Sequence, residues 1–128
     1  MFEEAYGNLP PEDFLERLNE KKDLLVLLAY SGDVLIGFKI GYVRYKGVFF
    51  SWLGGVVSGN RRKGVARALL RRQHEICLER GYEEIQTEAS GSNQPMLILN
   101  LQEDFEIYGS RLGRMGELKV DLRKRISE

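Results

Sequence analysis

Apolar residues recur along the chain with two different periods, and the change between them separates two groups of predicted elements. Three long apolar stretches come first, at residues 23–30, 34–45 and 48–57, and they are rich in aliphatic, β-branched and aromatic residues. Residues 31–33, Ser-Gly-Asp, and residues 46–47, Lys-Gly, separate these stretches, and both are combinations typical of tight turns. The first half is therefore predicted to be an antiparallel meander.

Helical spacing begins at residue 64. Residues 64–80 place apolar side chains such as Val65 and Leu69 on one face, and Gly81 is a residue type that commonly ends a helix. A strand, its crossover helix and the next strand pair in parallel or nearly so, so residues 48–57 and 82–89 are expected to be parallel neighbours. The other predicted elements are a helix at residues 9–22, a second helix from near Asn93 with Pro95 in its first turn, and closing strands at 104–109 and 116–126.

These elements predict one domain of the α/β (α+β) class over residues 1–128, with a mixed, mostly antiparallel central sheet. A chain of 128 residues is long enough to bury a single hydrophobic core. The sheet is expected to be antiparallel at both ends, with a strand–helix–strand unit between them.

The composition narrows the chemistry that this domain can carry. Lys plus Arg and Asp plus Glu are equal at 19 each, so the net charge gives no sign of a nucleic-acid partner. Cys77 is the only cysteine and His74 the only histidine, which argues against a disulfide framework and against a cysteine- or histidine-based metal site. Since the chain has no apolar run of membrane-spanning length and no signal-peptide pattern, we expect a cytoplasmic protein without a metal.

A cluster of cations stands directly before the first long helix. Arg61, Arg62 and Lys63 precede Gly64, although a helix N-terminus already carries partial positive charge. Such a terminus binds phosphate through its free N–H groups, glycine allows a ligand to approach the backbone, and cations add charge-assisted hydrogen bonds. The alternative is a solvated basic loop. The coincidence of strand, cations, glycine and helix favours an anion site.

Two common phosphate motifs do not fit this segment. A nucleotide-hydrolysing P-loop requires Gly-Lys-Ser/Thr, whereas Lys63 here precedes Gly64 and Val65 follows it. A dinucleotide fingerprint requires three spaced glycines after the first strand of a parallel sheet, and that pattern is also missing.

Arg61-x-x-Gly64-x-Ala66 resembles the acyl-CoA pyrophosphate loop of the GNAT N-acyltransferases, whose pattern is Gln/Arg-x-x-Gly-x-Gly/Ala. The resemblance extends to "GGVVSGNRRKGVARALL", to "NQPMLILNLQEDFEIYG" and to "SGDVLIGFKIGY", which follow the order of that family's elements. It covers about residues 24–123. It implies a splayed strand–loop–helix site for acetyl-CoA as co-substrate.

The resemblance also implies roles for individual residues. The backbone of Val56 and Val57, at the end of the splayed strand, would bind pantetheine and the acyl carbonyl. Asn93 would contact CoA or cap the second helix, and these roles are compatible. The residues implied around the pyrophosphate are Arg61, Arg62, Lys63, Gly64, Val65, Ala66 and Arg67.

The chain departs from the family pattern at three places. Asn100 is counted with the CoA-contacting positions, but it stands where many members carry the tyrosine that protonates the leaving thiolate, and an amide has no such proton. Asp104-Phe105 replaces a closing Gly-Phe pair, so an aspartate must make the turn. The segment before residue 23 is also shorter than the corresponding part of the family.

The remaining ionisable residues are predicted to be structural, except for one candidate general base. Glu88, near the end of the strand beside the splay, is the candidate general base, with a surface position as its alternative. Cys77 is expected in the core and His74 at a structural or solvent-edge position. Arg71 and Arg72 lie a turn beyond the loop and are expected to be ordinary surface charges.

The leading hypothesis is an acyl-CoA-dependent N-acetyltransferase in which a primary amine attacks the thioester directly in a ternary complex. Its acceptor would be an amine-bearing small molecule or protein, with a homodimer left open and no membrane partner expected. A non-catalytic CoA-binding module, or degenerate GNAT-like relative, is the alternative. A nucleic-acid binder fits less well because the aromatic residues lie in strands predicted to be buried.

Overall fold

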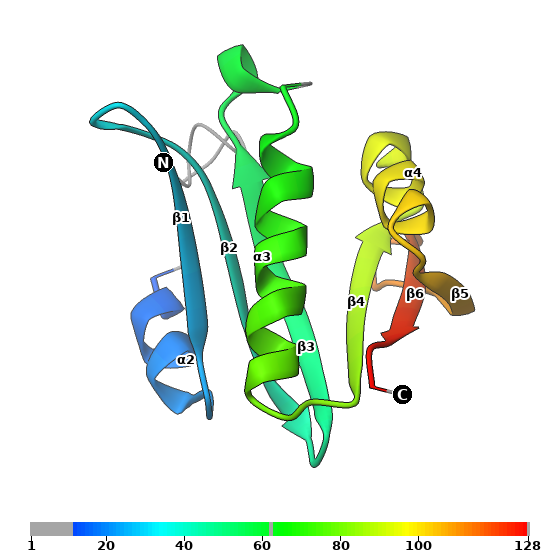
Figure 1. The fold of residues 1–128 in the computed structure, drawn as a ribbon. Coiled ribbons are helices and arrows are strands. Elements are labelled where there is room, and N and C mark those ends of the chain that lie inside the picture. The colour runs from blue at the N-terminus through cyan, green and yellow to red at the C-terminus, as the bar shows by residue number, and fades with distance from the viewer. Residues whose placement is uncertain (1–11, 62, 128) are drawn as a thin grey trace.

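The computed structural model describes residues 12–61 and 63–127, in which three α-helices pack against one six-stranded sheet (Figure 1). The elements in chain order are α2 (Phe14–Glu20), β1 (Leu25–Ser31), β2 (Val34–Tyr45), β3 (Val48–Val56), the 3-10 turn η1 (Ser58–Asn60), α3 (Val65–Glu79), β4 (Glu84–Ser90), α4 (Gln94–Gln102), β5 (Glu106–Leu112) and β6 (Leu118–Arg125). The predicted fold class is therefore confirmed.

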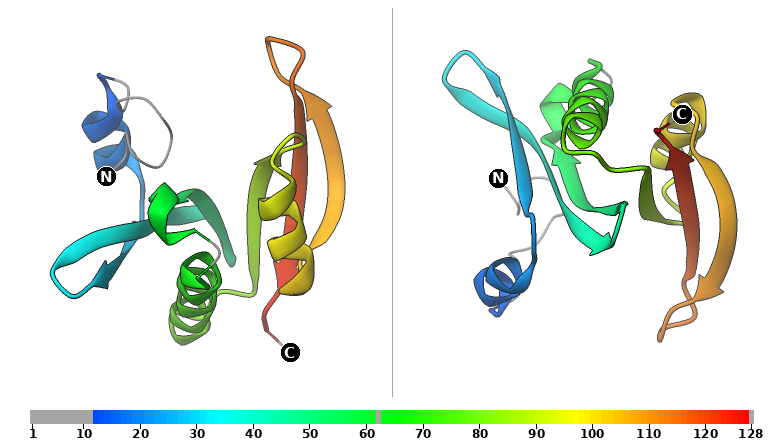
Figure 2. Two further views of the ribbon diagram at one scale, coloured as in Figure 1. Left: turned by 90° about the horizontal axis from the view of Figure 1, so that it is seen from above. Right: turned by 60° about the horizontal axis from the view of Figure 1, so that its bottom comes forward.

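The strands follow the order β1-β2-β3-β4-β6-β5 across the sheet. All neighbouring pairs are antiparallel except β3 and β4, which are parallel and are joined by α3. This confirms the predicted meander, the parallel crossover and the antiparallel closing strands. Helices α3 and α4 lie on one face of the sheet and α2 on the other (Figure 2).

Backbone conformation explains where several elements begin. Asp23 has φ 53, so the first strand starts at Leu25 rather than at residue 23. Asp104 has φ 72 and makes the turn after α4, as expected for an aspartate in place of glycine. The predicted strand 104–109 accordingly begins at Glu106. Of the helix predicted at 9–22, the structure contains Phe14–Glu20, and residues 9–11 lie outside the described part.

The main core lies between the sheet and the two helices α3 and α4. Phe49, Ile85 and Leu122 come from three strands and are almost fully buried, and Cys77 of α3 packs with them. Burial raises the pKa of the Cys77 thiol to about 12, so this side chain is a thiol at neutral pH. Its predicted role in the core is confirmed.

Aromatic side chains attach α2 to the opposite face. The rings of Phe14 and Trp52 are 6.1 Å apart, and Trp52 meets Tyr42 edge to face at 5.7 Å. Trp52 is also the extra residue of a β-bulge, because Ile40 pairs with Leu53 while Gly41 pairs with Ser51. The bulge lies next to the point where β3 leaves β4.

Leu122→Ala should lower the free energy of unfolding by about 2–5 kcal/mol, because it opens a cavity in the core where β6 joins β4 and the two helices. Urea denaturation followed by circular dichroism measures this loss. Leu112→Ala on the neighbouring strand β5 is the control, since Leu112 is 71% exposed and its truncation should change stability by less than about 0.5 kcal/mol. Equal effects of the two variants would contradict the assigned core.

Candidate functional site

The parallel strands β3 and β4 pair over only part of their length. Their register runs from Val48 opposite Glu84 to Ser51 opposite Thr87, although β3 continues to Val56 and β4 to Ser90. Beyond Ser51 the two strands therefore diverge. Figure 1 shows β3 and β4 spreading apart toward the end of the sheet where α4 lies.

The end of β3 directs particular peptide groups into the divergence. The N–H of Val57 donates to the carbonyl of Ile36 on β2, so in this antiparallel ladder the bonds to β2 recur at Gly55 and Leu53. The peptide groups of Gly54 and Val56 consequently face the other side, where β4 has moved away. Of the two valines named from the sequence, Val56 faces the divergence and Val57 is bonded to β2.

The segment after β3 brings a cation and a helix N-terminus to the same place. The guanidinium Nε of Arg61 donates to the carbonyl of Val56 at 3.0 Å, which ties the loop to the end of the strand. Gly64 then takes φ 81 and ψ 6, a left-handed conformation that favours glycine, and α3 begins at Val65. The first N–H groups of a helix have no intrahelical acceptor and point outward.

A cavity of about 800 Å³ lies between this strand end, the start of α3 and the start of α4. Its volume is in the range of sites for small molecules and cofactors. The residues that line it include several named from the sequence: Val56, Arg61, Gly64, Val65, Ala66, Arg67 and Asn93. Lys63 instead lines a smaller cavity of about 400 Å³ between β1, β2 and α3, and Arg62 lies outside the described residues.

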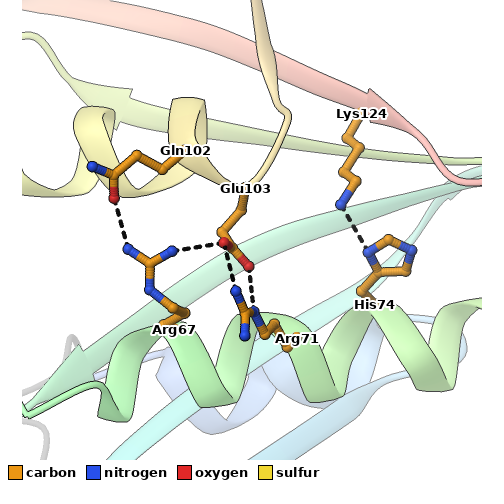
Figure 3. A network of polar contacts seen from close by, with 6 residues as sticks. All are labelled: Arg67, Arg71, His74, Gln102, Glu103 and Lys124. Atoms are coloured by element: carbon orange, nitrogen blue, oxygen red, sulfur yellow. Dashed lines mark hydrogen bonds and ion pairs between the residues drawn. The ribbon is translucent and has the colours of Figure 1, made fainter.

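An ion-pair network joins the two helices that wall the cavity (Figure 3). Arg67 and Arg71 of α3 each approach the carboxylate of Glu103, at the end of α4, to 2.7 Å, and Arg67 also donates to the Gln102 side chain at 2.6 Å. Glu103 is only 9% exposed, so its charge is largely removed from water. The hydrogen bond from Arg71 and the charges of both arginines lower the pKa of this carboxyl.

This network differs from the sequence-based interpretation of Arg71. Arg71 was expected to be an ordinary surface charge, but it holds a nearly buried carboxylate of another helix. The pairing was not visible in the sequence because Glu103 lies 32 positions further along the chain. Arg72, by contrast, pairs with Glu75 within α3 and is exposed, as expected.

The two asparagines of α4 lie differently relative to the cavity. Asn93 lines it and is also the N-cap of α4, where its side chain accepts a hydrogen bond from the N–H of Met96. Asn100 is 4% exposed and donates its amide to the carbonyl of Met96. The structure thus places Asn100 inside the helix packing and outside the residues that line the cavity.

Lys39 of β2 also lines the cavity, and the sequence analysis did not name it. The signal was a single cation in the otherwise apolar segment "GFKIG" of a central strand. Gly54, opposite it in the register, was likewise missed, although paired glycines inside a strand are a sign of close backbone approach.

Glu88, the candidate base, lies on the other face of β4. Its neighbours in the strand, Thr87 and Ala89, turn toward α3 and α4, and side chains alternate between the faces. The Glu88 carboxylate forms an ion pair with the guanidinium of Arg111 at 2.8 Å, and Arg111 also pairs with Asp121. His74 contacts the ammonium of Lys124 at 3.0 Å, and burial together with that cation lowers its pKa. His74 thus has the structural position expected of it.

The described residues contain neither a metal-binding cluster nor a membrane-spanning helix. Within 12–61 and 63–127, no three His, Cys, Asp or Glu side chains gather as a metal site would require. In the same part of the chain, no helix combines the length and apolar character needed to cross a bilayer.

The split of two parallel strands beside a glycine-started helix, with a large cavity between, is the arrangement of an acyl-CoA-dependent transferase. The family model described as "Acetyltransferase (GNAT) family" matches residues 1–99, and the chain belongs to this family. The acetyltransferase SG1711 of Sodalis glossinidius (strain morsitans) is 27% identical over 105 residues, which cover 82% of this chain and 72% of that protein.

Solved structures share the fold at low sequence identity. The ribosomal-protein-S18-alanine N-acetyltransferase of Escherichia coli matches with a TM-score of 0.84 and 20% identity, covering 98% of this chain and 83% of that one. Ard1 of Thermoplasma volcanium matches with a TM-score of 0.85 and 16% identity, covering 96% and 84%. An aminoglycoside 6′-N-acetyltransferase complexed with coenzyme A gives 0.79 and 12%, covering 92% and 82%.

Glu103→Gln should lower the melting temperature at neutral pH, because it leaves two arginines without their shared carboxylate. The pKa of Glu103 is lowered on folding, so its contribution is complete above its ordinary value of 4.5 and is lost as the pH falls through the lower, folded value. The difference in melting temperature between wild type and variant should therefore shrink in acid. Thermal unfolding at neutral and acidic pH measures it.

Glu106→Gln is the matched control for that change. Glu106 is 66% exposed and pairs with one arginine, Arg123, so its replacement should alter the melting temperature little. A pH-independent effect of Glu103→Gln, or an equal effect of both variants, would contradict the network as a link between α3 and α4.

Proposed function

We propose that this protein is an N-acetyltransferase that moves an acetyl group from acetyl-CoA to a primary amine by direct attack in a ternary complex. The observation that carries the proposal is the cavity at the divergence of β3 and β4, with the Gly64 loop and the first turn of α3 at its border. Membership of the GNAT acetyltransferase family supports acyl transfer from CoA.

In this proposal, the two ends of the cavity bind different parts of acetyl-CoA. The N–H groups at the start of α3, with Arg61 beside them, would donate hydrogen bonds to the oxygens of the diphosphate. Arg62 and Lys63 would add charge to the surroundings of the loop. The peptide groups of Gly54 and Val56, which face the divergence, would bind the pantetheine arm and the acyl carbonyl. A peptide N–H at that carbonyl stabilises the oxyanion of the tetrahedral intermediate.

The amine would approach through the divergence from the face opposite α3 and α4. Glu88 of β4 lies on that face and remains the candidate base, acting directly or through water once Arg111 is displaced from it. The acceptor class stays broad. Structural neighbours include an enzyme named for the alanine of ribosomal protein S18 and one named for an aminoglycoside, so both a peptide N-terminus and a small polyamine belong in an acceptor panel.

A CoA-binding module without activity is the second candidate. It is favoured by Asn100, whose amide is buried and bonded to the carbonyl of Met96, so that it offers no proton to a leaving thiolate. Release of CoA from acetyl-CoA in the presence of the acceptor panel separates the enzyme from the module. We further propose a cytoplasmic location, where acetyl-CoA and amine acceptors are both available.

CoA and acetyl-CoA, but not ATP, should raise the melting temperature of the protein, and Gly64→Val should remove this effect. A β-branched residue would project where the ligand approaches the backbone, and the loss of one or two charge-assisted hydrogen bonds of about 1.5–3 kcal/mol each predicts at least a tenfold loss of affinity. Isothermal titration calorimetry with CoA measures it.

Gly116→Val provides a control matched in geometry. Gly64 and Gly116 have φ 81 and φ 80, and an added Cβ meets no atom within 4 Å at either position. Both variants therefore carry a similar backbone strain of about 1–3 kcal/mol, but Gly116 lies in the β5–β6 turn, away from the cavity. Gly116→Val should retain CoA binding. Retention of full affinity by Gly64→Val would overturn the loop assignment.

A further inference from the structure

Lys39 lies on β2, opposite the part of β3 that no longer pairs with β4. It pairs in register with Gly54, and its side chain extends across that glycine: a Cβ on Gly54 would lie 3.6 Å from Lys39 Cγ and 3.7 Å from Nζ. Since the peptide group of Gly54 faces the divergence, the ammonium of Lys39 stands directly beside the backbone that would bind the acyl carbonyl. Its register partner Gly54 is two residues before Val56 on β3, and the Arg61 loop follows Val56.

The surroundings of Lys39 leave its charge without compensation. Within the described residues, it makes no hydrogen bond or ion pair, and no acidic side chain lines the cavity. Its register partners are Leu27 on β1 and Gly54 on β3, while α4 presents Asn93, Met96 and Leu99. The other charged groups on the cavity are Arg61 and Arg67, which are also cations. Burial lowers the pKa of Lys39 to about 8.

Lys39 is therefore the one described group on this cavity that can release a proton near neutral pH. The other polar side chains on the cavity carry guanidinium or amide groups, which do not act as proton donors in proteins. A general acid is most effective when its pKa lies near the working pH, and a thiol has a pKa of about 8.5 in the unperturbed cysteine side chain. The pKa of the Lys39 ammonium is therefore close to that of a thiol.

We propose that Lys39 is the general acid that protonates the sulfur of CoA as it leaves the acyl group. The proposal rests on the acyl transfer proposed above and identifies a catalytic residue for it. It also supplies the proton donor that the buried Asn100 does not provide.

The proposed reaction forms one C–N bond and breaks one C–S bond. The neutral acceptor amine forms the C–N bond, and the attacked carbonyl becomes an oxyanion bound by the backbone of β3. When the intermediate collapses, the C–S bond breaks and its electron pair leaves on sulfur, while Lys39 Nζ donates one proton to form the CoA thiol. The acceptor nitrogen loses its extra proton to Glu88, directly or through water as proposed above, and Lys39 regains a proton from solvent.

The test uses CoA itself as the probe, because its thiol reports the neighbouring charge without an acceptor. The thiolate absorbs in the ultraviolet, so a pH titration of the difference spectrum between complexes with CoA and with S-methyl-CoA gives the thiol pKa, while tyrosine ionisation cancels. An ammonium beside sulfur favours the thiolate, so the bound thiol should titrate about one unit or more lower in wild type than in Lys39→Met.

Two further variants make the result specific. Lys39→Gln tests whether a polar but uncharged side chain behaves like methionine, and it should also raise the thiol pKa above the wild-type value. Lys46→Met removes the same charge from the exposed β2–β3 turn and should leave the thiol pKa at the wild-type value. The thiol pKa of every variant is measured at saturating CoA.

The outcomes separate this proposal from the one it rests on. If wild type fails to bind CoA, the proposed acyl transfer is overturned. If CoA binds but its thiol has the same pKa in wild type, Lys39→Met and Lys39→Gln, the CoA site stands and the role of Lys39 is overturned. Loss of CoA binding in both Lys39 variants would make Lys39 a binding residue and would also overturn its proton-donor role.

Discussion

The divergence of two parallel strands is the constraint on which the rest of this structure depends. β3 and β4 stop pairing after Ser51 and Thr87, so the peptide groups at the end of β3 lose a neighbouring strand. In a continuous sheet such groups bond to the next strand, whereas here the carbonyl of Val56 accepts a hydrogen bond from the Nε of Arg61 in the following loop. In the function proposed above, a ligand bound along the end of β3 would occupy the place of the neighbouring strand. The proposed binding site is thus a consequence of the interrupted pairing of β3 and β4.

The helices turn this gap into a cavity of defined shape. α3 is anchored at its start by the loop, through Arg61 and the carbonyl of Val56, and α4 is held against α3 by Glu103. Because the two arginines contact one nearly buried carboxylate, a shift of α4 would leave that charge unpaired. The network therefore holds α3 and α4 at a fixed distance across the cavity. Arg67, which the sequence analysis expected at the pyrophosphate, is part of this network.

The sequence predicted local features well and contacts between distant segments poorly. Helix and strand patterns, the glycine before α3 and the turn at Asp104 depend on near neighbours, and the structure agrees with each. The pairing of Arg71 with Glu103 and the turning of Asn100 into α4 depend on how two helices meet. The position of Lys39 depends on register, which assigns it to Gly54 across the hairpin. Periodicity within one segment does not specify such pairings.

The energetics of Lys39 connect stability with chemistry. Its pKa falls from 10.5 to about 8 on folding, so the unfolded chain binds more protons between these values. The loss of folding free energy caused by burying the Lys39 ammonium is complete below pH 8. It disappears as the pH rises through 10.5, the pKa of the unfolded chain, so the protein carries it in full at neutral pH. Methionine or leucine at this position would fill similar space without that cost. Negative charge developing on a neighbouring sulfur would stabilise the ammonium, so the unfavourable charge of the empty cavity becomes favourable as the C–S bond breaks.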